Sequence, residues 1–384
     1  MRARELMHRL VGALRGFGFK QWFLLILNVV LVVATIASLI GLNVVSHTLE
    51  SVRASENFRG ESDMRFAQIA CFMPVGMGKE DSDIFAFRQT LDSKLMEQSL
   101  EAPENGSLYL DAYSTTADVT ASSDSTGNVQ VKAIAVGGEF FYFHPLQLRS
   151  GSYISSDDLM DDLVVLDEEL AWRLFGGVEL SGMTMTINGQ PFVVAGVISR
   201  EDDFATKKAY SAEAGLFMSY SALKRLDETT TINCYEIIMP DPITNFALSV
   251  VQESFPQEDA DVVENSSRYS LGHLLSVIGS FGDRSMRVNG VIYPYWENAV
   301  RLTEDYAALL LILSVLFALC PLTFAVVLVI KYIVRGYRAV KKAVPEKVEA
   351  AIEQRREERL EREYEKKAGV RFPGGGKAHG RQRL

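Results

Sequence analysis

Two long apolar segments divide the sequence into a short N-terminal end, a large middle region and a C-terminal end. Residues 23–45 and 307–330 contain no charged side chain. Each segment exceeds the roughly 20 residues that a helix needs to cross the hydrocarbon core of a bilayer. We therefore predict transmembrane helices at residues 21–45 and 306–334, on either side of a folded domain at residues 46–305.

Between the two segments, short apolar runs alternate with amphipathic stretches. The strand-like runs lie at residues 65–73, 108–113, 129–136, 163–166, 192–198, 216–218 and 232–239. Apolar residues at helical spacing lie at residues 83–96, 170–175, 219–226, 245–253 and 297–305. This interleaving predicts an α+β domain, with β-α-β units around a mixed sheet. We also predict a polar helical stalk at residues 47–59, a surface loop at 115–128 and a loop returning towards the membrane at 273–281.

Residues 163–198 carry the clearest local pattern in the chain. After an apolar strand, Asp167 is placed to cap a short helix with an apolar stripe, and Gly176 follows where a left-handed residue is favoured. Alternating apolar and polar residues then lead into Asn188 and Gly189, a two-residue hairpin turn. The segment predicts a strand, a capped helix and a hairpin, and it contains no catalytic residue pattern.

The order of phrases in this part of the chain resembles the MacB-like core domain of ABC-transporter permeases. The phrases are LRSG at residues 148–151, VVLDEELAWRLFG at 164–176, SGMTMTINGQPF at 181–192 and VVAGVI at 193–198. The positions that carry the resemblance are Gly151, Asp167, Leu174, Phe175, Gly176, Gly182, Gly189, Gly196 and Val197. The resemblance covers roughly residues 20–255, and one departure is Ser152, where the family often has arginine.

The resemblance implies an extracytoplasmic core domain of two lobes, which moves with the spans as a separate subunit hydrolyses ATP. The family's permeases have three spans after the core domain, whereas this chain has one apolar segment there. The resemblance therefore implies an accessory or partial permease that assembles with a fuller one, or a relative that is no longer coupled to ATP.

Charge is distributed in step with the apolar segments. The net charge is +4 over residues 1–20, −22 over residues 46–305 and +8 over residues 331–384. Lys and Arg thus flank both segments on the side away from the middle region, which predicts cytoplasmic termini and an extracytoplasmic domain. We expect the plasma or inner membrane of a bacterium, with the lipid bilayer as a partner and no nucleic acid.

The two ends of the chain are basic in different ways. Residues 1–20 place leucines at helical spacing between arginines, which predicts a basic amphipathic helix on the inner membrane surface, with a frayed tail as the alternative. The first apolar segment is interpreted as an uncleaved anchor rather than a signal peptide, because no small-residue cleavage site closely follows it. Residues 335–384 predict a charged, solvated helix, with a coiled coil as the alternative, and a disordered basic tail.

Individual residues in and beside the apolar segments suggest further contacts. Pro321 predicts a kink in the second span. Asn28 in the first span and Thr323 in the second are candidates for hydrogen bonds between helices. Tyr293, Tyr295 and Trp296, just before the second span, suit either the membrane interface or stacking on the domain.

The sequence has three cysteines. Cys71 and Cys234 lie in strand-like runs outside the membrane, where a disulfide is chemically allowed. They would pair if their strands are neighbours, and otherwise remain two buried thiols.

Catalytic and metal-binding patterns are missing from the sequence. It contains no G-x-x-x-x-G-K-[ST] phosphate loop, no G-x-S-x-G and no H-E-x-x-H. We interpret His144 as a packing histidine and the acidic residues at 157–162 and 201–203 as solvated surface rather than a cation site. We therefore predict a protein that is not an enzyme and that binds no cofactor or metal.

Three hypotheses for function follow. The first is a non-catalytic membrane subunit of a MacB-type ABC transporter, with an ABC ATPase subunit and a fuller permease chain as partners and with homo-oligomers also considered. The second is a two-span sensor or signalling subunit. The third is a polysaccharide chain-length regulator, which should have long extracellular helices rather than strands and short helices.

Overall fold

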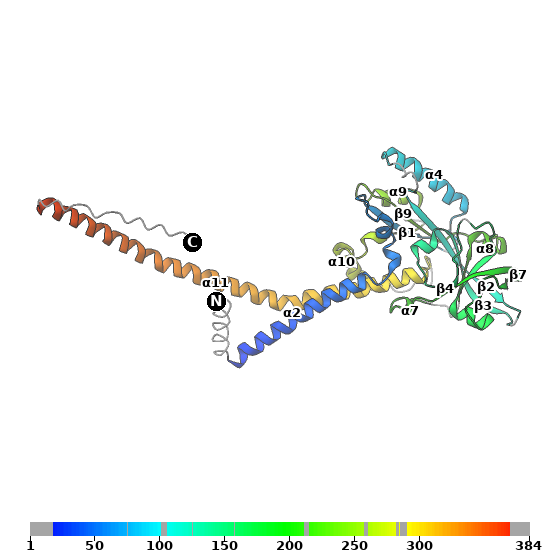
Figure 1. The fold of residues 1–384 in the computed structure, drawn as a ribbon, viewed down its shortest axis with the longest axis horizontal. Helices are drawn as coiled ribbons and strands as arrows, with labels where there is room; N and C mark the ends of the chain where they lie inside the picture. Colours follow the sequence, from blue (N-terminus) through cyan, green and yellow to red (C-terminus); the bar gives the residue numbers. More distant parts are fainter. Residues whose placement is uncertain are drawn as a thin grey trace, which may run out of the picture. The chain divides into compact units, whose positions relative to one another are not determined.

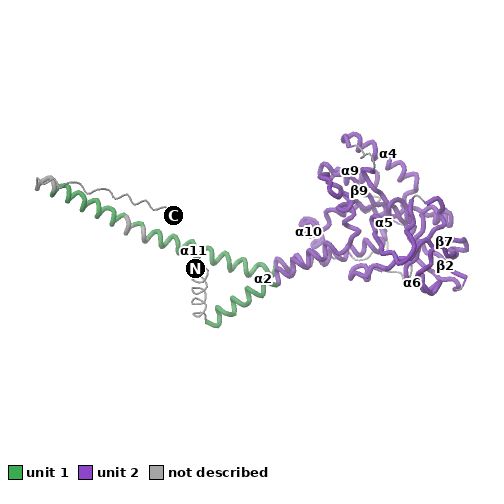
Figure 2. The backbone as a smooth tube through the Cα atoms, in the orientation of Figure 1, with its two compact units in different colours: residues 1–33, 316–384 green, residues 34–315 purple. Residues whose placement is uncertain are grey.

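The computed structural model describes residues 18–74, 76–100, 106–124, 126–156, 158–210, 215–256, 260–281, 284 and 290–368. The chain forms two compact units, shown in Figure 2: Met1–Val33 with Leu316–Leu384, and Ala34–Val315. The amphipathic helix predicted near the N-terminus and the disordered tail predicted beyond residue 368 lie outside the described residues.

Two helices correspond to the apolar segments: α2 (Phe19–Ser46) and α11 (Tyr295–Ala368). Both are long and apolar enough to cross a membrane. α11 is one uninterrupted α-helix through Pro321, and it includes the predicted helices on both sides of the second span. Within this chain the Asn28 amide donates to the Leu24 carbonyl and the Thr323 hydroxyl to the Cys320 carbonyl, each inside its own helix, so bonding of these side chains to another helix stays a prediction.

The unit Ala34–Val315 contains the rest of the regular structure. Its strands are β1 (Phe66–Phe72), β2 (Leu110–Ser122), β3 (Val129–Gly138), β4 (Leu148–Gly151), β5 (Leu163–Asp167), β6 (Thr184–Ile187), β7 (Gln190–Ile198), β8 (Gly215–Ser219), β9 (Cys234–Pro240) and β10 (Asp261–Glu264). Its shorter helices are η1 (Glu50–Val52), α3 (Ala54–Arg59), α4 (Asp81–Glu97), α5 (Phe140–Phe143), α6 (Glu168–Phe175), α7 (Thr206–Ala209), α8 (Tyr220–Leu226), α9 (Phe246–Ser254), η2 (Asn265–Ser267) and α10 (Leu271–Gly279).

The described strands form one mixed sheet of ten strands. Its order is β10-β1-β9-β2-β3-β8-β5-β7-β4, with β6 paired to β2 and β7. The β3–β8 and β5–β7 pairs are parallel, and the remaining pairs are antiparallel. The predicted α+β domain with a mixed sheet is confirmed.

Side chains alternate between the two faces of the sheet, as they do along any strand. In β1, Ile69 and Cys71 pack into one core with α4 and α9, whereas Ala70 and Phe72 pack into another with α5 and the start of α11. On the first face, a second core forms around β5, β7 and β8 under α6 and α8. Both cores lie on one continuous sheet, and α4 and α9 lie on the β1–β9 half (Figure 1).

Three sequence predictions were wrong. The surface loop predicted at 115–128 is largely strand β2, because Val119 and Ala121 alternate into the core and the strand pairs with β3 up to Ala121. The loop predicted at 273–281 is mostly helix α10, whose Leu274 and Val277 are buried against α11. The predicted stalk is not continuous with α2, which ends at Ser46 and is followed by η1 and α3.

Local signals in the most strongly patterned segment were predicted correctly. Asp167 caps α6 by accepting a hydrogen bond from the Leu170 backbone N–H at 2.7 Å. Gly176 ends α6 in the left-handed conformation, with φ of 75°. Asn188 and Gly189 both have positive φ, 50° and 79°, as a two-residue hairpin turn of this kind requires.

Candidate functional site

The most extensively bonded buried polar site lies where α11 begins to pack on the core domain. Arg268 follows η2, and its side chain is only 1% exposed. Its Nη2 lies 2.5 Å from Oε2 of Glu297, and its Nη1 lies 3.1 Å from Oε1 of Glu304. Its Nε donates to the side-chain oxygen of Asn265 at 2.7 Å. The guanidinium is thus bonded at all three nitrogens.

More charged residues surround this pair of glutamates, and we name the whole group the junction cluster. Its members are Asp261, Arg268, His273, Arg284, Glu297, Arg301, Glu304 and Asp305.

Two further arginines and a histidine complete the bonding of the junction cluster. Arg301 bonds Glu297 at 2.8 Å and Asp261 at 3.0 Å, so it connects α11 to β10. Arg284 pairs with Glu304 and with Asp305. Nε2 of His273, on α10, lies 2.9 Å from Oε1 of Glu304. Each carboxylate on α11 in the cluster therefore has at least one cationic partner.

The electrostatics of Arg268 follow from its burial and its partners. Burial alone would lower the pKa of the Arg268 guanidinium, but the charges of Glu297 and Glu304 outweigh it and raise the pKa. The side chain is therefore a permanent cation in a dry environment. Removing one partner would leave an uncompensated buried charge, which is expensive. The cluster holds α11 against the domain.

Sequence reasoning missed the junction cluster. Arg268 lies 29 residues from Glu297 and 36 from Glu304, so no local pattern joins them. One signal was present, because Glu297, Arg301 and Glu304 fall at i, i+4 and i+7 and so share one face of a helix. The sequence does not show which residues pair with this charged stripe. The partner, Arg268, is known only from the folded structure.

A second buried group involves the aromatic residues before the span. Nε2 of His144 lies 2.6 Å from Oε2 of Glu236, and both side chains are about 5% exposed or less. The His144 ring packs on Trp296, with centroids 4.8 Å apart, and on Phe140 at 4.6 Å. The prediction that His144 is a packing histidine is confirmed. Of the two alternatives for Trp296, stacking on the domain is the one observed.

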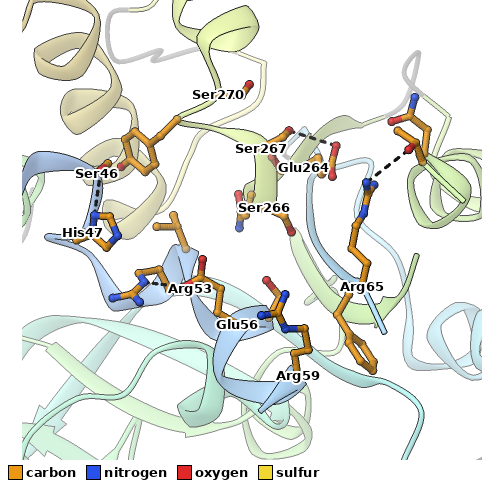
Figure 3. Close-up of a pocket in the computed structure, with 17 residues that line it drawn as sticks. Ser46, His47, Arg53, Glu56, Arg59, Arg65, Glu264, Ser266, Ser267 and Ser270 are labelled. Atoms are coloured by element: carbon orange, nitrogen blue, oxygen red, sulfur yellow. Dashed lines mark hydrogen bonds and ion pairs between the residues drawn. The ribbon is translucent and has the colours of Figure 1, made fainter. Parts of the chain in front are cut away.

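A polar pocket of about 650 Å³ opens beside the C-terminal end of α2. As Figure 3 shows, Arg53, Glu56 and Arg59 of the α3 segment face Ser266 and the neighbouring serines across it, and Arg65 borders another side. Arg53 pairs with Glu56 at 2.9 Å, and Arg65 pairs with Asp241. The side chain of Arg59 is exposed, and no ion pair to another described residue is recorded for it.

The positions that carry the resemblance lie at close backbone contacts, at turns or in the core of this fold. Gly151 has φ of 72°, and a Cβ atom there would lie 2.0 Å from the Ala195 carbonyl oxygen. A Cβ on Gly196 would lie 2.4 Å from the Ser152 carbonyl oxygen, so the two glycines allow β4 and β7 to approach. Gly182 also has positive φ, 84°. Leu174 and Val197 are buried in the core, and Phe175 packs on it.

Cys71 and Cys234 are both buried free thiols. Their strands are neighbours, but the register pairs Cys71 with Tyr235 and Phe72 with Cys234. Cys71 packs with the α4–α9 core and Cys234 with the opposite core, so the two thiols point to different faces of the sheet. The suggested disulfide is therefore wrong for this fold, and the alternative of two buried thiols describes it.

Among the described residues, no group of three or more His, Cys, Asp or Glu side chains is arranged to hold a metal ion. The acidic residues at 201–203 serve local structure instead. Asp203, for example, accepts from the backbone N–H groups of Ala205 and Thr206 at 2.8 and 3.0 Å.

Comparison with known proteins gives one family and several solved folds. The model of the family described as MacB-like periplasmic core domain matches residues 25–268. Among curated proteins, none matches this chain.

Three solved structures are similar in part. The periplasmic region of MacB from Actinobacillus actinomycetemcomitans is 16% identical, with 60% of this chain and 98% of that chain covered and a TM-score of 0.39. The extracellular domain of the noncanonic ABC-type transporter YknZ from Gram-positive bacteria is 14% identical, covering 51% and 99%, with a TM-score of 0.35. A domain of a putative permease protein from Porphyromonas gingivalis is 12% identical, covering 52% and 89%, with a TM-score of 0.31.

The family match extends over more than half of the chain, from within α2 to the end of η2, and it includes the segment whose phrases resemble the family. The ten-stranded mixed sheet is preceded by one long apolar helix in the sequence and followed by another. This order agrees with a periplasmic core domain anchored in a membrane. This chain belongs to the family of the MacB-like periplasmic core domain, found in permeases of the ABC-transporter type.

Proposed function

We propose that this chain is a non-catalytic membrane subunit of a MacB-type ABC transporter, which couples ATP hydrolysis by a partner to substrate movement outside the membrane. The observation that carries the proposal is the junction cluster. It bonds the first turns of α11, the helix that continues into the second apolar segment, to the core domain.

The geometry of the junction suits the transmission of force. Glu297 and Glu304 are seven residues apart, or about 10 Å along a helix, and they lie on the same face. Arg268 bonds both, so a shift or rotation of α11 relative to the domain would break at least one buried ion pair. Breaking a buried pair costs several kcal/mol, about 3–5. Movement of α11 is therefore transmitted to the domain rather than lost at the joint.

The proposed arrangement in the membrane follows from charge. Residues 1–20 and 335–384 would be cytoplasmic, residues 21–45 and 306–334 would cross the bilayer, and residues 46–305 would be extracytoplasmic. The net positive charge outside both apolar segments supports this orientation. Single cysteines introduced in a Cys-free variant would test it. An impermeant maleimide should label a cysteine at Thr126 in intact cells and should leave one at Ala350 unlabelled.

The proposed partners supply what this sequence lacks. The chain contains no phosphate loop, so an ABC ATPase subunit would hydrolyse ATP, and a fuller permease chain would complete the membrane part. Self-association is a further option for the assembly. The pocket beside the outer end of α2, with the exposed Arg59, is where we place contact with a substrate leaving the bilayer.

The decisive experiment is purification of the tagged chain from its own cells in a gentle detergent, followed by mass spectrometry. We expect an ATPase with a Walker motif and a multi-span permease in stoichiometric amounts. A tagged membrane protein of similar size from the same cells, unrelated to transporters, is the control. Repeated recovery of the chain alone or with itself only would overturn ATP coupling and favour the sensor hypothesis.

The chain-length regulator hypothesis has less support. It expects long extracellular helices, whereas in the described part of residues 47–294 the longest helix is α4, with 17 residues. The domain is instead organised around a sheet of ten strands.

A further inference from the structure

Helix α10 exposes apolar side chains that no other described residue covers. Leu271 and Leu275, about one helical turn apart, are 63% and 57% exposed. Phe281, which follows the helix, is 40% exposed. The opposite face of α10 is also apolar, and it is buried. A helix that is apolar on both faces is typical of a buried or membrane-associated helix rather than of one on a water-exposed surface.

Charged side chains are missing from this segment. Residues 271–281 contain no Asp, Glu, Lys or Arg, although residues 46–305 as a whole carry a net charge of −22. The one ionisable side chain of the segment is that of His273, and its Nε2 lies 2.9 Å from Oε1 of Glu304 on α11. The exposed residues of α10 are leucine, glycine and serine only. Moving this face out of water therefore incurs no cost of desolvating a charge.

The buried face of α10 packs on both long apolar helices. It forms one cluster with side chains of α2 and α11, whose members include Leu42, Val45, Leu274, Val277, Ala307 and Ala308. The contact residues of α2 and α11 lie at the ends of the uncharged segments 23–45 and 307–330 that adjoin the core domain. The exposed apolar face of α10 is therefore continuous with the apolar surface of the two helices that are long enough to cross a membrane.

The length of the second segment gives the height of α10 relative to a bilayer. Residues 307–330 would extend about 36 Å as a helix, whereas the hydrocarbon core is roughly 30 Å thick. In the proposed arrangement Lys331 marks the inner edge of that core, so the end at Ala307 reaches about 6 Å beyond the outer edge. This height lies within the head-group layer, where interfacial helices bury an apolar face among lipids.

We propose that α10 is an interfacial helix, with Leu271, Leu275 and Phe281 inserted into the bilayer leaflet on the side of the core domain. The proposal rests on the proposed arrangement in the membrane but not on coupling to an ATPase. Because His273 bonds α10 to α11 beside the junction cluster, insertion would hold the core domain at a fixed height above the lipid. The membrane surface would thus be a third attachment of the domain, in addition to α2 and α11.

The test uses nitroxide labels on single added cysteines in the full chain, reconstituted in phosphatidylcholine nanodiscs. The background is Cys320→Ser, whose two remaining thiols are buried, and its own label signal is subtracted. Electron paramagnetic resonance compares the collisions of each label with oxygen, which concentrates in lipid, and with nickel-EDDA, which stays in water. Labels at Leu271→Cys and Leu275→Cys should collide more often with oxygen. The matched control is Leu159→Cys, at a fully exposed leucine elsewhere in the domain, and its label should collide more often with nickel-EDDA.

A further label separates this proposal from the membrane arrangement on which it rests. Leu39 is a 48% exposed residue of α2, and a label at Leu39→Cys should prefer oxygen. If it does so while the labels at Leu271 and Leu275 prefer nickel-EDDA, α10 lies in water and only the interfacial helix is overturned. A preference for nickel-EDDA at Leu39 as well would overturn both.

A protein partner on the same face would give a different result. If the labels at Leu271 and Leu275 collide with neither reagent, protein covers α10, for example a second copy of the chain, and the lipid contact is overturned. All the altered side chains are exposed, so the fold should not change, and near-UV circular dichroism of each variant checks this.

Discussion

Arg268 and Glu304 form an ion pair of 3.1 Å in which each side chain is only 1% exposed. One residue follows η2 in the core domain, and the other lies on the helix that continues into the second apolar segment. A pair buried this deeply persists only where further bonds satisfy both groups, and here Asn265, Glu297 and Arg284 provide them.

Replacing Arg268 by methionine should therefore destabilise the chain strongly. Arg268→Met leaves two buried glutamates without their main partner, and we expect a loss of about 3–5 kcal/mol in the free energy of unfolding. The measurement is guanidinium denaturation of the detergent-solubilised chain, followed by tryptophan fluorescence.

The matched control for that prediction is Arg225→Met. Arg225 pairs with Asp161 at 2.7 Å, but the two side chains are 57% and 41% exposed. An exposed pair contributes about 0–1 kcal/mol, so this variant should be almost as stable as the unaltered chain. Similar losses in the two variants would show that the buried cluster does not hold α11 in place.

Glu201 should make stability depend on pH. Burial raises the pKa of the Glu201 carboxyl, and the nearby charge of His144 only partly offsets this effect. The folded chain then binds this proton more tightly than the unfolded chain does. Its contribution to stability is complete below the ordinary pKa of glutamate and is lost as the pH rises through the raised, folded-state pKa.

Glu201→Gln removes that titration. We expect the variant to be more stable than the unaltered chain at neutral pH, with the difference shrinking towards pH 4 in thermal unfolding scans. Glu228→Gln, at an exposed position, is the control and should change little at either pH. A variant that is less stable than the unaltered chain at neutral pH would contradict the assigned cause.

The two buried thiols should be unreactive in the folded chain. Burial raises the pKa of both Cys71 and Cys234, and the nearby charge of Glu236 raises each further. Since the thiolate is the reactive form, a maleimide should modify neither residue in a Cys320→Ser background until denaturant is added. Intact-mass spectrometry counts the labels, and a mass two hydrogens lower without reductant would instead indicate a disulfide.

Gly151 should not tolerate a side chain. A methyl group at this position meets the Ala195 carbonyl oxygen and forces an L-residue into φ of 72°, so Gly151→Ala should cost about 2 kcal/mol or more. Gly177→Ala is the control, because no atom lies within 4 Å of a Cβ there and its φ is not positive. It should stay within about 0.5 kcal/mol. Equal melting temperatures for the two variants would refute the close approach of β4 and β7.

Features that depend on neighbouring residues could be predicted from the sequence. The two apolar helices, the cap at Asp167, the helix end at Gly176 and the Asn188-Gly189 turn each depend on residues only a few positions apart. The resemblance carried by the same segment led to the correct family, and the interleaved pattern led to a mixed sheet. In each case the deciding physics is local: hydrophobic length, backbone conformation or a capping hydrogen bond.

Only the tertiary structure decided the rest, because the interactions join distant parts of the chain. Strand β2 itself has a Ser/Thr-rich sequence that is typical of a loop. Pairing with β3 and burial of Val119 nevertheless hold it in an extended strand. The register between β1 and β9 places Cys71 and Cys234 on opposite faces, which no spacing in the sequence reveals.

The candidate site shows most clearly that interactions between distant residues cannot be predicted from the sequence. Arg268 has no neighbour in sequence that explains it, and its role follows from a fold that places η2 beside α11. The sequence by itself determined where the two long apolar helices and the family motif lie, since short-range forces act there. The folded domain determined which charges are buried together, since burial is a property of the assembled core.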